Sequence, residues 1–258
     1  MFINGLTMAQ WTIFLLVLVR CAALIMTLPF FGSANLPVML KAGLSMSLAL
    51  VISPLVPTGA FHLPTTVPGF LFLAAGEMML GAILGLAVRL LFTSVQIMGQ
   101  LVGFQMGFAV ANVLDPVSGG QVSVLAQFCF LMALLTLFAV NADHWFFKAL
   151  ADSFVLVRPG DITMSRSLFD QMMKLSSEMF ALSVRLGAPV IAALLFTQVT
   201  MGILAKTVPQ MNILIVGFPL TVSVGLIFLS LTLTMMIPTL ARLFSQLGPT
   251  LAGLLKAM

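Results

Sequence analysis

Charged residues are scarce in this 258-residue chain. They make up 7% of the sequence, whereas an ordinary soluble domain has roughly 25%. A soluble protein of this length could not cover its surface with so few charges. Together with a hydrophobic share of 61% and a mean hydropathy of +1.19, this scarcity predicts an integral membrane protein.

The residues of common catalytic and metal sites are also few. The two histidines, His62 and His144, lie in different predicted loops, so they cannot form a histidine-rich metal set. Cys21 and Cys129 lie in separate apolar runs and are interpreted as small core residues. The sequence has no GxSxG, P-loop or HExxH motif. We therefore expect neither an enzyme nor a bound cofactor or metal.

The basic excess does not indicate nucleic-acid binding. The net charge is +4, but the Lys and Arg residues form no stripe, tyrosine is absent and the Phe residues sit in apolar runs. Loop lysines and arginines on a membrane protein explain the same excess. We expect membrane lipid, and no nucleic acid, as a partner.

Long apolar runs are what the sequence does contain. A helix that crosses about 30 Å of hydrocarbon needs about 20 residues. The matching segments are 11–30, 38–57, 69–92, 122–141, 180–204 and 211–237. The stretch 93–110 either extends the third segment or forms its own helix. Prolines and glycines break the chain at 29–37, 53–69 and 207–212, and Pro238 is predicted to close the last run. The prediction is an all-α chain of about six long apolar helices, in one membrane-embedded domain over 1–258.

A polar connection over 143–180 interrupts the apolar runs. Ten charged residues fall between 143 and 185. Within this region apolar residues recur at spacings of four and three, which predicts an amphipathic helix; they are Leu168, Met172, Leu175, Met179 and Leu182. Asp161 is predicted to cap its start. Either the helix is a solvated connection or its polar face docks a partner.

Small residues recur every four positions in the next motif, which comprises Gly99, Gly103, Gly107 and Ala111. Gly81 and Gly85 form a shorter GxxxG pair. In a membrane such strips allow two helix backbones to pack closely. The neighbour is either a helix of the same chain or another subunit, and the sequence leaves both alternatives open.

Three ionisable residues lie inside apolar runs, where each needs a partner or water. They are Arg20, Glu77 and Arg89. Arg20 and Glu77 are the candidate buried ion pair, although Arg89 could also bind the Glu77 carboxylate. One acid without an Asp or His chain does not make a proton relay.

The phrase VANVLDPVSGG, residues 110–120, is a turn between apolar runs. Asp115-Pro116 disfavours helix, and the Gly119-Gly120 pair gives a flexible turn. The residues around it are apolar, and comprise Phe104, Met106, Phe108, Val110, Val113 and Leu114. Non-helical backbone at membrane depth must be buried in protein or line a cavity. The segment is therefore either a surface hairpin or a buried constriction.

Two sequence blocks resemble the bacterial flagellar export family FliR, whose virulence-secretion homologues share the family. The first is GFQMGFAVANVLDPVSGGQVSVLAQF at 103–128, followed by LFAVNADHWF at 137–146. The second is GILAKTVPQMNILIVGFPLTVSVGL at 202–226. Chain length and hydropathy match along essentially the whole sequence.

The resemblance implies a helical, hetero-oligomeric export gate in the inner membrane at the flagellar basal body. FliP-like and FliQ-like subunits, and an FlhB-like export component, would be its partners, and unfolded flagellar proteins its cargo. It also implies that the loop at 106–120 plugs the closed channel. Met106 and Phe108 would then face the pore, Gly107, Gly119 and Gly120 would act as hinges, and Asp115-Pro116 would fix the turn.

Three alternatives remain at this point. A virulence-type secretion subunit shares the family. A small-solute transporter would need a polar site at the membrane midplane, which helices broken at Pro189 and Pro219 could provide. A scaffold subunit would never line the channel.

Overall fold

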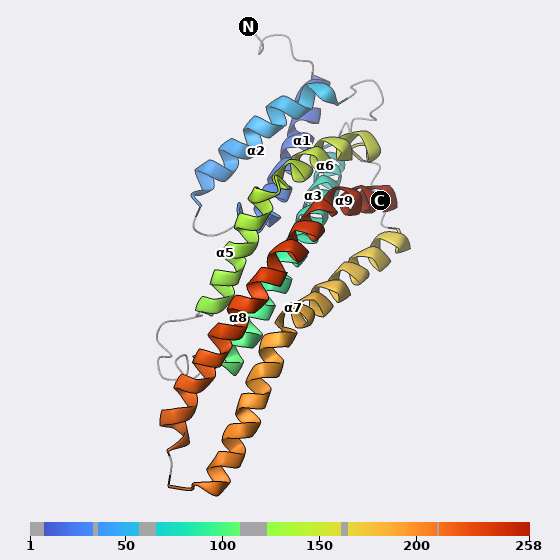
Figure 1. Ribbon diagram of the computed structural model, residues 1–258. Helices are drawn as coiled ribbons and strands as arrows, with labels where there is room; N and C mark the ends of the chain where they lie inside the picture. Colours follow the sequence, from blue (N-terminus) through green and yellow to red (C-terminus); the bar gives the residue numbers. More distant parts are fainter. Residues whose placement is uncertain (1–7, 33–35, 57–65, 109–122, 161–164, 211) are drawn as a thin grey trace. The chain divides into compact units, whose positions relative to one another are not determined.

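The computed structural model describes residues 8–32, 36–56, 66–108, 123–160, 165–210 and 212–258 (Figure 1). Within these residues the chain forms helices and turns and no strand. The helices are α1 (Met8–Thr27), α2 (Val38–Ile52), η1 (Ser53–Leu55), α3 (Val67–Gln105), α5 (Val124–Ala139), α6 (Asp143–Leu156), α7 (Arg166–Thr207), α8 (Ile213–Ser245) and α9 (Leu247–Ala257). The all-α class predicted from the sequence is confirmed.

Most of these helices are long and apolar enough to cross a membrane. Among the described residues, α1, α2 with η1, α3, α7 and α8 each meet the requirement of length and composition. A sixth span would be added if α5 and α6 count together as one broken span. The predicted number of about six long apolar helices is therefore confirmed.

The structure settles where several of the predicted helices end. Residues 93–105 extend the third helix and do not form one of their own, because α3 continues to Gln105. The predicted segment 180–204 belongs to one helix with the amphipathic stretch before it, since α7 begins at Arg166. The break predicted at 29–37 lies between the end of α1 and the start of α2, and that at 207–212 begins at the last residue of α7, before α8 starts at Ile213. The break predicted at 53–69 begins with η1 and ends in the first turn of α3.

The prediction about Pro238 was wrong, because this residue does not end the last helix, which continues to Ser245. Pro189 lies inside α7 and Pro219 inside α8, so neither proline ends its helix. A proline removes one backbone hydrogen bond from a helix, and spanning helices tolerate that loss where neighbouring groups compensate. The broken helices that could have provided a polar transporter site at Pro189 and Pro219 are therefore not found in α7 and α8.

The chain divides into two compact units. The first comprises Met1–Leu90, Ala142–Leu175 and Gln246–Met258, and the second comprises Leu91–Asn141 and Ser176–Ser245. The α3 and α7 helices each contribute their first part to the first unit and their remainder to the second. The single domain expected over 1–258 stays a prediction.

In the first unit α1 packs against α2, and α6 packs against α9. The α3 helix approaches α1 at Gly81, where an added Cβ would lie 2.5 Å from the Arg20 carbonyl oxygen. On the α9 side, Gly248 contacts the ring of Trp145, and α9 buries four leucines, Leu247, Leu251, Leu254 and Leu255. Gly81 therefore allows the close approach of α3 to α1, and Gly248 allows that of α9 to α6.

The start of α7 is capped differently from the prediction. The Ser165 hydroxyl accepts a hydrogen bond from the Leu168 amide at 3.1 Å and donates to the Ala257 carbonyl, at the end of α9. Ser165 therefore acts as the N-cap. Asp161, the residue predicted for that role, lies outside the described residues.

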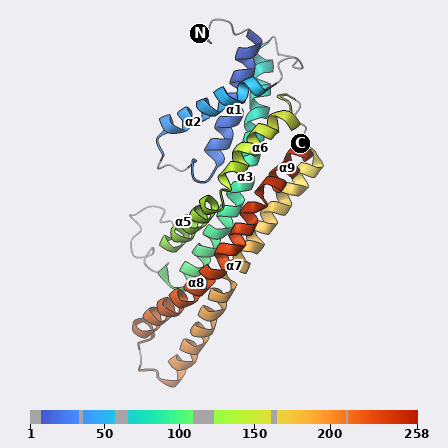
Figure 2. The same cartoon turned by 45° about the horizontal axis from the view of Figure 1, so that its top comes forward.

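In the second unit α5 packs against α8, and the remainder of α7 runs antiparallel to α8 (Figures 1 and 2). Three phenylalanines from three helices meet in its core. The ring centroid of Phe92 on α3 lies 5.5 Å from those of Phe130 on α5 and Phe244 on α8. Phe92 and Phe244 are fully buried.

Candidate functional site

A fully buried arginine joins three helices of the first unit. The Arg20 Nε of α1 donates to Glu77 Oε2 of α3 at 2.5 Å. Its Nη1 donates to the Ser153 hydroxyl of α6 at 3.0 Å. Both Nη atoms reach the carbonyl of Val157, just after α6, at 3.3 and 3.2 Å. The guanidinium Cζ also lies 4.1 Å from the ring centroid of Phe154. We call these five residues the Arg20 cluster.

Burial explains why the cluster contains so many contacts. The side chains of Arg20 and Glu77 have no exposed surface. A charge removed from water is costly unless a counterion and hydrogen bonds replace the water. The planar guanidinium presents five donors, which suits it to several acceptors at once. Among the described residues, one Glu77 oxygen, Oε1, has no hydrogen-bond partner.

The sequence allowed two partners for Glu77. The structure pairs it with Arg20, whereas Arg89 is exposed at the surface of α3. The pairing depends on α1 and α3 approaching closely at Gly81, one helical turn from Glu77. The cluster can fix α6 to α1 and α3, and among the five residues that form it Glu77 is the one acid.

A second feature lies at the end of α3, where the segment 106–120 that was predicted to plug the channel begins. The Met106 amide still donates to the Val102 carbonyl at 2.9 Å, and the Gly107 amide donates to the Phe104 carbonyl at 3.1 Å. Gly107 has φ +92°, a conformation that glycine adopts at little cost. A Cβ at this position would also lie 3.2 Å from the Phe218 ring. The positive φ and the nearby Phe218 ring therefore both favour glycine at position 107.

Met106 packs against α8. Its side chain is fully buried and fills the space above Gly225, where an added Cβ would lie 2.7 Å from the Met106 Cγ. The Thr221 hydroxyl donates to the Met106 carbonyl at 3.3 Å and to the Phe218 carbonyl at 3.0 Å. We call the contact of Met106 with Thr221 and Gly225 the Met106 anchor.

The anchor differs from the role predicted for Met106. Its side chain is fully buried against α8, where Gly225 leaves a space that the unbranched methionine fills, and the pore-facing role stays a prediction. Phe108, the other predicted pore-facing residue, is 38% exposed. The remaining predicted plug and hinge residues lie outside the described residues, namely Val110, Val113, Leu114, Asp115, Pro116, Gly119 and Gly120.

The small-residue strip divides into a packed part and a loop part. Gly99 and Gly103 lie against the start of α5: a Cβ on Gly99 would be 2.6 Å from the Ala126 Cα, and one on Gly103 would be 2.8 Å from the Ser123 Oγ. For these two glycines the close neighbour belongs to the same chain. Gly107 falls after the helix, and Ala111 lies outside the described residues.

Metal-binding and cysteine chemistry were also considered from the sequence. In the described part of the chain, no three His, Cys, Asp or Glu side chains come together as a metal set. Cys21 and Cys129 are buried and unbridged.

Sequence reasoning missed the residues that complete both features. Ser153 and Val157 lie in the polar connection, and no motif or periodic pattern there indicated that these two residues contact Arg20. Thr221 and Gly225 lie inside GFPLTVSVGL, where a small residue four positions after a threonine could have suggested a contact with another helix.

Comparisons with known proteins identify the family of the chain. The model of the family "Bacterial export proteins, family 1" matches residues 11–247. The flagellar biosynthetic protein FliR of Bacillus subtilis (strain 168) is 33% identical over 246 residues, 94% of either chain. FliR of Escherichia coli (strain K12) is 30% identical, covering 93% of this chain and 92% of the relative. FliR of Pectobacterium carotovorum subsp. carotovorum is 31% identical, covering 98% and 96%. The chain therefore belongs to the bacterial export proteins, family 1, the family of the flagellar biosynthetic protein FliR.

Proposed function

We propose that this chain is a non-enzymatic subunit of the flagellar type III export gate. It would assemble with FliP-like and FliQ-like subunits, and with an FlhB-like component, in the bacterial inner membrane. Unfolded flagellar proteins would cross through the channel so formed. The observation that carries the proposal is the family match over residues 11–247, together with the flagellar names of the relatives.

The surface of the chain supports assembly with other membrane proteins. Only 17% of the α2 span and 22% of the α8 span are buried within the chain. Large apolar side chains are exposed on both, for example Met39 at 89% and Met235 at 71%. Spanning helices expose such surface to lipid or to neighbouring subunits. A gate subunit needs this surface because it must contact unlike partners.

The Met106 anchor supports a gating role for the loop of residues 106–120. A plug must stay attached at one end while its apolar part moves. The anchor supplies that attachment through the Met106 side chain, which packs against Gly225, and through the hydrogen bond from Thr221 to the Met106 carbonyl. Gly107 follows directly with a positive φ, so the chain can change direction there. In this mechanism Phe108 and the apolar residues after it seal the channel, and Met106 holds them in place.

Deletion of the gene, scored for motility and for secretion of flagellar proteins, tests the function. The proposal expects both to be lost and both to return with the wild-type gene. Purification of the chain with its complex should also yield unlike small membrane proteins. Normal motility and normal secretion in the deletion strain would contradict the flagellar role. Loss of a different secretion system would instead favour the virulence-type homologue.

Site-specific crosslinking from Phe108 distinguishes a gate from a scaffold. A photoreactive residue at 108 should form an adduct with an arrested export substrate, since this position begins the proposed seal. The same residue placed at Phe72, which is 81% exposed on α3, serves as a control for crosslinking that any exposed position would give. Equal adduct yields at the two positions, or none at 108, would contradict the gate role of the loop.

A further inference from the structure

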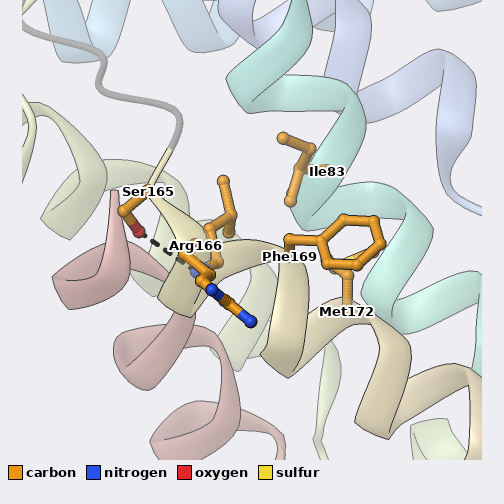
Figure 3. A pocket seen from close by; sticks show the side chains of 6 residues that line it. Ile83, Ser165, Arg166, Phe169 and Met172 are labelled. Carbon is orange, nitrogen blue, oxygen red and sulfur yellow. Dashed lines mark hydrogen bonds between the residues drawn. The ribbon is translucent and has the colours of Figure 1, made fainter.

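A hollow in the first unit lies outside the features described above. It has a volume of about 540 Å³ and is lined by Ile83, Ser165, Arg166, Leu168, Phe169 and Met172. Figure 3 shows Ile83 of α3 facing Phe169 and Met172 of α7, with Arg166 between Ser165 and Phe169. The volume falls within the roughly 300–1,000 Å³ of small-molecule sites.

The lining selects a ligand that is mostly apolar. Four of the side chains are Ile, Leu, Phe and Met, and Leu168 is buried between them while Phe169 is 64% exposed. The Ser165 hydroxyl is already used, because it caps α7 and donates to the Ala257 carbonyl. A sugar, nucleotide or other strongly polar ligand would therefore leave most of its polar groups without partners.

One positive charge is available to the ligand. Arg166 is exposed, and no carboxylate of the described residues lies within ion-pair distance of it. It is the first residue of α7, in the amphipathic part of that helix. An exposed guanidinium can bind a phosphate in a bidentate manner.

We infer that this hollow binds an anionic phospholipid, with an acyl chain against Ile83, Phe169 and Met172 and the headgroup phosphate on Arg166. Both parts of the ligand are needed to match the lining. An uncharged amphiphile would leave the guanidinium without an anion, and free phosphate would leave the apolar wall without a partner. The inference concerns the first unit alone and does not depend on the proposed export function.

Lipid retention by the purified full chain tests the inference. The chain is equilibrated in detergent with phosphatidylglycerol or phosphatidylcholine of the same acyl composition, and retained lipid is counted by native mass spectrometry. We expect phosphatidylglycerol to be retained in preference to phosphatidylcholine. Arg166→Gln should lower its retention about fivefold, the effect of one basic residue near an anionic membrane surface. Arg158→Gln is the matched control, since it removes an exposed arginine of the same region that does not line the hollow.

Filling the hollow tests the apolar half of the site. Ile83→Trp should abolish retention, whereas Leu86→Trp, at an exposed position of the same helix, should leave it unchanged. Excess inorganic phosphate should not displace the lipid. Displacement by phosphate, equal retention of the two lipids, or equal retention by Arg166→Gln and wild type would each overturn the inference. An assembled gate that retains no phosphatidylglycerol would overturn it too, and would assign the hollow to a protein neighbour.

Discussion

The Arg20 cluster and the Met106 anchor hold helices together by different physics. The first consists of two opposite charges with no exposed surface, and every contact of the arginine is a hydrogen bond or a cation–π contact. The second consists of the apolar Met106 side chain packed against Gly225, together with one neutral hydrogen bond from Thr221 to the Met106 carbonyl. Removing one partner of a buried ion pair costs about 3–5 kcal/mol, whereas a neutral hydrogen bond contributes about 1 kcal/mol.

Both contacts hold an element in place, and they differ in how much movement they tolerate. A transition that separated Arg20 from Glu77 would leave a buried charge without its counterion, so the cluster suits a fixed part of the protein. The Met106 anchor tolerates small shifts of the chain beyond it, because methionine can change rotamer while it stays packed against α8. A plug that moves needs both contacts: a fixed frame and an adaptable attachment at one end.

The largest expected effect is that of Glu77→Gln. Glutamine keeps the size of the side chain but removes the charge, so Arg20 would stay buried without a counterion. We expect a loss of about 3–5 kcal/mol in unfolding free energy, measured by thermal or denaturant unfolding in detergent with the fluorescence of Trp11 and Trp145. Arg89→Gln, at the exposed arginine of the same helix, should change stability far less.

The double variant Arg20→Met with Glu77→Leu sharpens that test. Replacing both members of a buried pair by apolar residues is often neutral or stabilising, so most of the stability lost in Glu77→Gln should return. If Glu77→Gln unfolds at the wild-type temperature, the cluster is not the fixed part of the protein.

A smaller effect is expected at the close approach of α1 and α3. Gly81→Ala would place a Cβ 2.5 Å from the Arg20 carbonyl oxygen and 2.9 Å from the Ala23 Cβ, and backbone cannot move aside cheaply. We expect a loss of about 1–3 kcal/mol. At Gly43 of α2 no atom lies within 4 Å of an added Cβ, so Gly43→Ala should instead stabilise its helix by about 0.5–1 kcal/mol. Thermal unfolding of both variants in the same detergent measures the difference, and equal shifts would remove the packing role of Gly81.

The smallest effect on stability is expected at the Met106 anchor. Gly225→Ala displaces the end of a flexible side chain, and the helix gains from the alanine, so the net loss should stay below about 1 kcal/mol. Gly202→Ala is the matched control, because nothing lies within 4 Å of its added Cβ. Despite its small effect on stability, Gly225→Ala should raise the ion permeability of membranes that contain the assembled gate. A permeability equal to that of Gly202→Ala would contradict the anchoring role.

The helices were predictable from the sequence because the apolar runs are long and their breaks contain proline and glycine. The length of α3 was not, since nothing in residues 93–105 distinguishes an extension from a separate helix. The prediction at Pro238 failed because the rule that proline ends a helix holds best in water, and Pro189 and Pro219 also lie inside continuous helices. In a spanning helix the alternative to a weakened helix is exposed backbone in hydrocarbon, which costs more.

The site was predictable only in part. Arg20 and Glu77 stood out because charges in apolar runs are rare, but Ser153 and Val157 could not be found because hydroxyls and carbonyls carry no periodic signal. The burial of Met106 depends on Gly225, more than 100 residues further along the chain. A contact of this kind is set by tertiary packing, which no local pattern encodes.

Solute permeability of the assembled gate after deletion of residues 110–116 tests the central claim most directly. The deletion leaves Met106, Gly107 and Phe108 in place but removes most of the proposed seal. If the loop plugs the channel, membranes with the variant gate should leak ions and small solutes that the wild-type gate retains. Co-purification of the partner subunits with the variant shows that the gate is still assembled. Unchanged permeability with an assembled gate would contradict the plug, and with it the role assigned to the Met106 anchor.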